Sequence, residues 1–221
     1  MVIDSAQPRY PFGEEIASSV IHGIGWVLSI AGLAVLVAFS AMQGDARAVV
    51  ASSVFGTTLI LLYTASTLYH SVPGVAAKRV LRTLDHIAIF LLIAGTYTPF
   101  TLLALPGAWG WGLFGTIWAL ALIGSAAELG LLKRYRKAAV AMYVAMGWVA
   151  LVAVEPLRAN VPTGGLVLLF GGGVAYTAGV PFYVARRLPY HHAIWHLFVL
   201  VGSVLHYLAV LLYVIPGASD R

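Results

Sequence analysis

Long apolar stretches alternate with short polar connections along almost the whole chain. A helix that crosses the hydrocarbon core of a membrane needs about 20 mostly apolar residues, and each stretch meets this length. Proline removes a backbone hydrogen bond and clashes with the preceding turn, so Pro99 should kink the third stretch. The pattern predicts seven spans, at roughly 17–42, 48–71, 84–104, 109–132, 138–157, 163–185 and 191–215.

Composition supports the same class of protein. Of the 221 residues, 61% are hydrophobic and only 10% are charged, which is outside the range of soluble domains. We therefore expect an all-α integral membrane protein, a seven-transmembrane helix bundle. It should form one domain over residues 1–221, with a short cytoplasmic segment at 1–16. The chain has no cysteine, so any transition metal must be held by histidine and carboxylate.

Basic residues gather in every second connection between the predicted spans. The clusters are Lys78, Arg79 and Arg82 after span two, the segment 133–137 after span four, and Arg186 and Arg187 after span six. Lysine and arginine in short loops mark the cytoplasmic side. The alternation predicts a cytoplasmic N-terminus and an external C-terminus. We interpret the formal net charge of +5 as this topology signal and expect no nucleic-acid partner.

Four ionisable residues fall at the cytoplasmic ends of three spans. His70 ends the second span, Asp85 begins the third, and His192 and His196 lie in the first turns of the seventh. Residues four apart share one face of a helix, so His192 and His196 can both point into the bundle. His191 is rotated by about 100° from its neighbour and is not expected to join them.

This residue set has the composition of a catalytic zinc site. Ionisable groups at membrane depth are rare and usually functional, and three histidines leave the fourth tetrahedral position of zinc open for water. Zinc lowers the pKa of that water to about 7, and a carboxylate can orient it and take its proton. Asp85 is the candidate for this role. Ser66, one turn before His70, could donate to a developing oxyanion or to the water.

The spacing leaves other roles open. Asp85 could bind zinc directly or form a hydrogen bond with a ligand histidine. The four groups could also form a proton relay or a hydrogen-bonded cluster that holds no metal. A bound cation is the favoured interpretation, because unpaired polar groups cost free energy in hydrocarbon and a shared ion satisfies all four together.

Five further polar residues receive structural interpretations. Glu15 and His22 lie near the same membrane face, where they could cap a cavity or a helix start. His86 is expected to be structural. Glu128 should pair with the basic residues that follow it. His206 lies deep in the seventh span and should form a hydrogen bond with a neighbouring helix.

Several short motifs contain the candidate residues. They are STLYH at 66–70, LDH at 84–86, IAGTYTPF at 93–100 and HAIWH at 192–196. In this order they resemble the bacterial hemolysin III proteins, which belong with the progestin and adipoQ receptors, including the adiponectin receptors. Residues 15–23 also resemble the first-span signature of that family. The likeness covers most of the chain.

The resemblance implies a seven-helix bundle with a cytoplasmic N-terminus and zinc held at His70, His192 and His196. It also implies that Asp85 lies near the zinc-bound water and that Ser66 completes a Ser-x-x-x-His element. The wider superfamily includes alkaline ceramidases, and adiponectin receptors are linked to ceramide hydrolysis. The bacterial members are named for haemolysis and are associated with membrane lipid homeostasis.

Three functional hypotheses follow. The first is a zinc-dependent hydrolase of the bacterial cytoplasmic membrane that cleaves a lipid amide or ester bond, with a membrane lipid or fatty acid in a cavity inside the bundle. The second is a receptor-like sensor of membrane state in which zinc is structural. The third is a pore. Channel linings usually carry polar residues through the full bilayer depth, whereas the candidate site is confined to one leaflet, which disfavours the pore.

Overall fold

The computed structural model describes residues 10–130, 135–185 and 187–218, apart from the side chains at 136, 137 and 218. These ranges are helical and contain no β-strand. Seven helical stretches are long and apolar enough to cross a membrane. The predicted all-α class and the predicted number of spans are therefore confirmed.

Four spans are built mainly from one long helix each, and three carry a change of helix type. The first four spans are α1 (Phe12–Met42), α2 (Ala46–Ser71), α3 (Val75–Pro99) with the π-helix η1 (Phe100–Ala104), and α4 (Gly107–Leu129). The fifth consists of α6 (Arg136–Gly147), the 3-10 helix η2 (Val149–Ala153) and α7 (Val154–Asn160). The last two are α8 (Thr163–Val184) and α9 (His191–Ala209), and α9 is followed by the π-helix η3 (Val210–Val214) and the 3-10 helix η4 (Pro216–Ala218).

Two helices begin earlier than the hydrophobic pattern predicts. α1 begins at Phe12, where position 17 was expected, and α3 begins at Val75, where position 84 was expected. Lysine and arginine are good helix formers, so Lys78, Arg79 and Arg82 continue α3 as a helix. The third span reaches 30 residues, which exceeds the length that the hydrocarbon core requires. Its charged first turns therefore extend beyond the apolar region.

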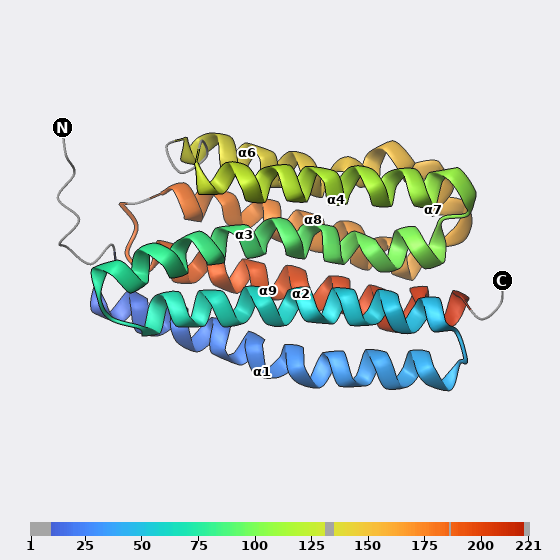
Figure 1. Ribbon diagram of the computed structural model, residues 1–221, viewed down its shortest axis with the longest axis horizontal. Coiled ribbons are helices and arrows are strands. Elements are labelled where there is room, and N and C mark those ends of the chain that lie inside the picture. The colour runs from blue at the N-terminus through green and yellow to red at the C-terminus, as the bar shows by residue number, and fades with distance from the viewer. Residues whose placement is uncertain (1–9, 131–134, 186, 219–221) are drawn as a thin grey trace.

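The helices lie side by side, and α3 is the most buried span (Figure 1). Consecutive spans α1, α2, α3 and α4 pack against one another. α6 contacts α3, α4 and α8, α8 packs on α9, and α9 returns to α1, so the bundle closes on itself. α1 begins at one end of the bundle and η4 lies at the other, as an odd number of spans requires (Figure 1).

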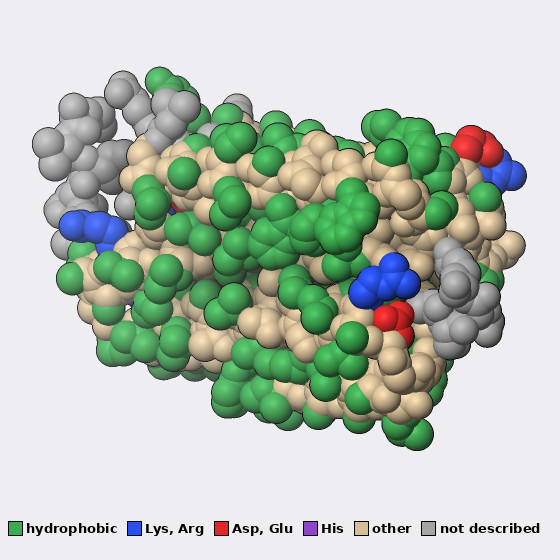
Figure 2. Space-filling model, turned by 45° about the vertical axis from the view of Figure 1, so that its right-hand side comes forward, with side chains coloured by type: hydrophobic (Ala, Val, Ile, Leu, Met, Phe, Trp, Pro, Cys, Tyr) green, Lys and Arg blue, Asp and Glu red, His purple; other side chains and the backbone are tan. Residues whose placement is uncertain are grey.

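The outer surface suits a lipid environment. Figure 2 shows hydrophobic side chains spread across the visible face and the few charged side chains towards its two ends. On α1, for example, Val20, Ile24 and Val27 are large apolar residues that are exposed. In water such a surface would be unfavourable, whereas hydrocarbon solvates it. The distribution is that of a multi-pass membrane protein.

The fold brings four helix ends together. α1, α3 and α9 begin, and α2 ends, at the same end of the bundle (Figure 1). This is the end at which the sequence places His70, Asp85, His192 and His196. The structure thus confirms their common end, while the assignment of that end to the cytoplasm stays a prediction.

Candidate metal centre

Three buried histidines come together at this end of the bundle. His70 lies in the last turn of α2, and His192 and His196 lie in the first turns of α9. One nitrogen from each ring lies within 4.8 Å of the other two, so the group could hold a metal ion. His191 is not part of it, and its Nδ1 lies 3.0 Å from the carbonyl oxygen of Phe182.

A carboxylate from the first helix orients His70. Nδ1 of His70 donates to Oε2 of Glu15 at 2.5 Å. The other carboxylate oxygen accepts from Nζ of Lys78 at 2.8 Å, and Lys78 also donates to the carbonyl oxygen of Tyr69. Lys78 thereby compensates the charge of a carboxylate that is only 7% exposed. Nε2 of His70 is buried and has no hydrogen-bond partner within the described part of the chain.

Two residues near the start of α1 hold His192. The hydroxyl of Tyr10 lies 3.2 Å from its Nδ1, and the two rings stack with centroids 4.4 Å apart. The backbone N–H of His192 donates to Oε1 of Glu14 at 2.7 Å. A carboxylate is favourable at this position, because the first N–H groups of a helix lack intrahelical partners and carry partial positive charge. Tyr190, just before α9, has a left-handed backbone (φ 55°), which is uncommon for a residue with a side chain.

The backbone of α1 and a fourth histidine hold His196. Its Nδ1 donates to the carbonyl oxygen of Ser18 at 3.4 Å. Its ring stacks on that of His22, with centroids 3.6 Å apart and planes 9° apart. His22 is buried, so it forms a wall of the centre.

On all three metal-site rings, Nδ1 is the nitrogen that has a hydrogen-bond partner in the protein. A carbonyl oxygen and a carboxylate only accept hydrogen bonds, so the protons of His196 and His70 lie on Nδ1 and the lone pairs lie on Nε2. Metal-binding histidines characteristically give their other N–H to such groups, which fixes the tautomer and the ring orientation. This observation fits a metal bound through Nε2.

The donor set also fits zinc. Imidazole suits zinc, and three protein ligands with an open fourth position are the pattern of catalytic zinc sites. Tetrahedral bonds of about 2.0–2.1 Å separate ligand nitrogens by about 3.4 Å. This separation lies within the 4.8 Å limit that the three nitrogens satisfy.

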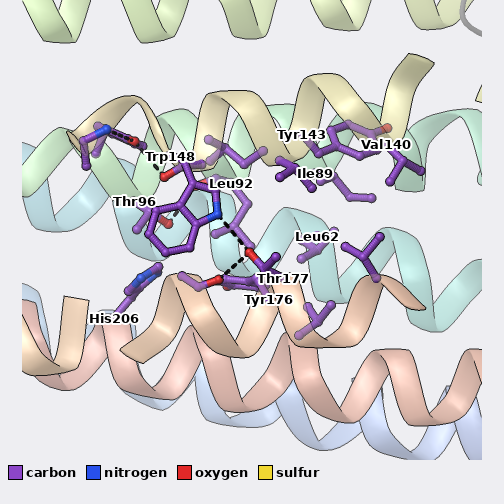
Figure 3. A pocket seen from close by; sticks show the side chains of 18 of the residues that line it. Leu62, Ile89, Leu92, Thr96, Val140, Tyr143, Trp148, Tyr176, Thr177 and His206 are labelled. Carbon is purple, nitrogen blue, oxygen red and sulfur yellow. Dashed lines mark hydrogen bonds between the residues drawn. The ribbon is translucent and has the colours of Figure 1, made fainter. Parts of the chain in front are cut away.

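An apolar cavity leads from the histidines into the bundle, with a volume of about 150 Å³. His192, His196, His22 and Asp85 line one part of it. Farther along, the lining is mainly aliphatic and aromatic and includes Phe100, Leu105, Leu157 and His206. Figure 3 shows part of this lining, from Val140 and Tyr143 to Trp148 and His206. A cavity with a few polar groups at one part and apolar walls elsewhere suits a ligand with a polar head and a hydrocarbon chain.

The two predicted catalytic residues have different surroundings. Asp85 is 7% exposed and lines the cavity together with His192 and His196. Ser66 is fully buried in α2, one turn before His70, and is not among the residues that line the cavity. Its Oγ has no hydrogen-bond partner in the described ranges. The catalytic roles of both residues stay predictions.

A second buried pair lies between α3 and α4. Nδ1 of His86 donates to Oε1 of Glu128 at 2.8 Å, and Glu128 is only 1% exposed. The side chains of the basic residues at 133, 134, 136 and 137, with which Glu128 was expected to pair, lie outside the described part of the structure. For His206 the prediction is confirmed: Nε2 forms a hydrogen bond of 2.9 Å with the carbonyl oxygen of Leu169 on α8.

Fold and histidine group together define a multi-pass helical membrane protein with a buried candidate metal centre at one end. Residues 10–207 match the family described as haemolysin-III related, and the chain belongs to this family. The resemblance noted from the motifs is thereby confirmed.

Individual relatives cover nearly the whole chain. Hemolysin-3 of Bacillus cereus is 46% identical over 206 residues, which are 93% of this chain and 94% of that protein. The Hemolysin-3 homolog of Bacillus subtilis (strain 168) is 44% identical over 200 residues, 90% of this chain and 94% of its own length. The human monocyte to macrophage differentiation factor is 29% identical over 215 residues, 94% of this chain and 87% of that protein.

Sequence reasoning did not assign the groups that hold the histidines. Glu15, Ser18 and His22 are spaced by three and four residues, so they share one face of α1, and this was the available signal. A carboxylate in the first turn of a membrane helix also needs a partner. Tyr10 precedes the helix and carried no such local signal.

Proposed function

We propose that this protein is a zinc-dependent hydrolase that cleaves an amide or ester bond in a membrane lipid, as a ceramidase does. The observation that carries the proposal is the orientation of three imidazoles, held through Nδ1, where an apolar cavity begins. Its role would be in membrane lipid homeostasis, and its occupants would be membrane lipids or a fatty acid.

Each candidate residue has a distinct task in this proposal. His70, His192 and His196 hold Zn²⁺, which when bound would polarise the scissile carbonyl and lower the pKa of a coordinated water. Asp85 orients the attacking water and accepts its proton. Ser66, one turn before His70, donates a hydrogen bond to the attacking water or to the carbonyl oxygen as negative charge develops there. The apolar walls hold the acyl chain and exclude bulk water.

The proposal includes a cellular location. We infer the bacterial cytoplasmic membrane, with the N-terminus in the cytoplasm and the C-terminus outside, from the alternating basic connections and from the bacterial Hemolysin-3 relatives. The metal centre then lies just below the inner headgroups. The chain acts as one seven-helix domain.

Lipid hydrolysis by purified protein tests the chemistry. The protein, with its zinc content measured, is incubated with separate pools of ceramides, other N-acyl lipids and glycerolipids, and released fatty acid is quantified by mass spectrometry. We expect release that chelation abolishes. Asp85→Ala should lose the release and keep zinc, whereas His192→Ala should lose both. Glu155→Ala is the matched control, since Glu155 is an exposed carboxylate paired with Arg158. No release from any pool, or release that survives Asp85→Ala, contradicts the proposal.

A structural role for zinc is the second candidate function. The three histidines and their partners connect α1, α2 and α9, so a metal here would cross-link three helices of a membrane-state sensor. In that case chelation lowers the thermal stability, and Asp85→Ala leaves cellular function intact.

The pore hypothesis has less support, because the cavity lining is mainly apolar away from the histidines. Ion flux through protein-containing liposomes is its direct test.

A further inference from the structure

The fifth span breaks beside the cavity, and one aromatic side chain reaches across from the break. α6 ends at Gly147, and the 3-10 helix η2 begins at Val149. The indole of Trp148 extends towards α8, where its Nε1 donates to Oγ1 of Thr177 at 3.0 Å (Figure 3). Thr177 is itself fixed, because its hydroxyl donates to the carbonyl oxygen of Gly173. Both Trp148 and Thr177 line the cavity.

The base of this side chain is also held in place. The single hydroxyl proton of Tyr97 is shared between the carbonyl oxygens of Met146 and Gly147, at 3.0 and 2.9 Å, and the hydroxyl oxygen accepts from the backbone N–H of Ala150 at 2.8 Å. These bonds replace intrahelical bonds that the break removes, as a polar backbone in hydrocarbon requires. Tyr97 on α3 therefore fixes the backbone on either side of Trp148, and Thr177 on α8 fixes its indole.

Helix geometry gives the depth of the indole below the metal centre. Tyr176, next to Thr177 on α8, forms a hydrogen bond with Ser203 on α9. Ser203 follows His196 by seven residues, which is about 10 Å at 1.5 Å per residue. The hydrocarbon of one leaflet is about 15 Å thick, because the whole core measures about 30 Å. A membrane-lipid chain whose head lies at the histidines is thus long enough to reach Trp148.

The cavity has lining on both sides of this level. Tyr143 and Ile89 line the part towards the histidines, and Leu157 and Leu105 line the part near the opposite end of the third and fifth spans. In Figure 3 the indole lies between Tyr143 and Ile89 on one side and His206 on the other, beside Thr96 and near Tyr176. A lipid chain that extends beyond the part of the cavity near the histidines must pass beside the indole of Trp148 or displace it.

We propose that Trp148, held by its hydrogen bond to Thr177, forms a constriction that limits the length of the lipid chain that this cavity can bind. This inference rests on the proposed function in one respect, that the occupant is a lipid chain. Shorter chains end before the indole. Longer chains must break the bond between Nε1 and Oγ1 or bend, and both cost binding free energy.

Competitive binding of fatty acids tests the proposal. Detergent-purified protein is incubated with an equimolar mixture of saturated fatty acids from decanoic to eicosanoic acid, and the bound acids are quantified by mass spectrometry. In Trp148→Leu the ratio of bound eicosanoic to bound dodecanoic acid should rise several-fold, because each additional methylene that finds room is buried. Thr177→Val keeps the indole but removes its anchor, so it should shift the ratio in the same direction by less.

The chain offers a matched control. Nε1 of Trp118 on α4 donates to Oγ1 of Thr98 on α3 at 3.1 Å, and neither residue lines the cavity. Trp118→Leu removes the same side chain and the same kind of bond elsewhere in the bundle, and it should leave the ratio unchanged. Thermal unfolding of all variants identifies any that fail to fold.

The possible outcomes separate the two proposals. An unchanged ratio in folded Trp148→Leu and Thr177→Val, or an equal shift in Trp118→Leu, overturns the constriction and leaves the lipid cavity standing. Absence of bound fatty acid in the wild type overturns both the constriction and the lipid substrate. A shift in Trp148→Leu without hydrolysis of any lipid supports the constriction and contradicts the enzyme.

Discussion

Glu15 links the candidate metal centre to the charged surface of the bundle. Its carboxylate accepts from Nδ1 of His70 with one oxygen and from Lys78 with the other. The interaction favours the tautomer of His70 that leaves Nε2 free to bind an ion. The histidines form the group, but residues of α1 determine how the rings are presented.

Removal of the Glu15 carboxylate should weaken metal binding. Partners of this kind typically contribute about 10–100-fold in metal affinity, so we expect a loss of this size in Glu15→Ala and a smaller loss in Glu15→Gln. Competition with a chromogenic chelator measures the affinity for zinc. Glu155→Ala, at an exposed carboxylate, should keep the wild-type affinity. Equal affinities in all variants would show that Glu15 does not support a metal ligand.

At the scale of elements, the departures from ideal α-helix are informative. The third span changes to the π-helix η1 directly after Pro99, which cannot donate a backbone hydrogen bond. The break at Gly147 in the fifth span contains no proline, and the hydroxyl of Tyr97 satisfies its backbone groups. Sequence reasoning identified the first irregularity and missed the second, because the second depends on a residue from another helix.

The break should depend on Tyr97 for stability. Tyr97→Phe removes the bond accepted from Ala150 and the donation shared by two carbonyl oxygens, and it leaves buried backbone groups unsatisfied, which costs about 1–3 kcal/mol of unfolding free energy. Tyr207→Phe is a control, because the Tyr207 hydroxyl makes one bond of 3.2 Å, to the carbonyl oxygen of Gly32. Unfolding in mixed detergent micelles compares the two. Equal stability of both variants would mean that the bonds of Tyr97 do not hold the break.

Contact between α1 and α2 should depend on Gly25. A Cβ atom at this position would lie 2.5 Å from the ring of Tyr63, a residue that is 1% exposed. Gly25→Ala should therefore destabilise the bundle by about 1–3 kcal/mol through overpacking. Gly112→Ala on α4 meets nothing within 4 Å and should be neutral or slightly stabilising. The same unfolding assay measures both, and a neutral Gly25→Ala would refute the tight contact.

For the whole molecule, charge and packing give complementary information. The bundle places the starts of α1, α3 and α9 and the end of α2 at one end, with the candidate metal centre (Figure 1). The basic connections predict that this end faces the cytoplasm. The sequence therefore predicts the sidedness of the candidate centre, and the fold shows how its residues come together.

Cysteine labelling tests which end of the bundle faces the cytoplasm. The chain has no cysteine, so no native thiol reacts with the label. Single exposed replacements that keep every charge are Ala46→Cys and Ala108→Cys at one end and Ala76→Cys and Leu188→Cys at the other. A membrane-impermeant maleimide should label the first two in intact spheroplasts. The other two should react only after permeabilisation. The reverse pattern would place the metal centre at the outer face.

The amino-acid sequence by itself determined the number of spans and the common end of His70, Asp85, His192 and His196. Apolar length, basic residues and helical spacing are local properties, and they suffice for these features. Only the tertiary structure decided that Glu15, Tyr10 and Ser18 hold the imidazoles and that Tyr97 ties the broken span. These contacts depend on the rotation and depth of one helix against another, which packing of the whole bundle sets and local spacing does not specify.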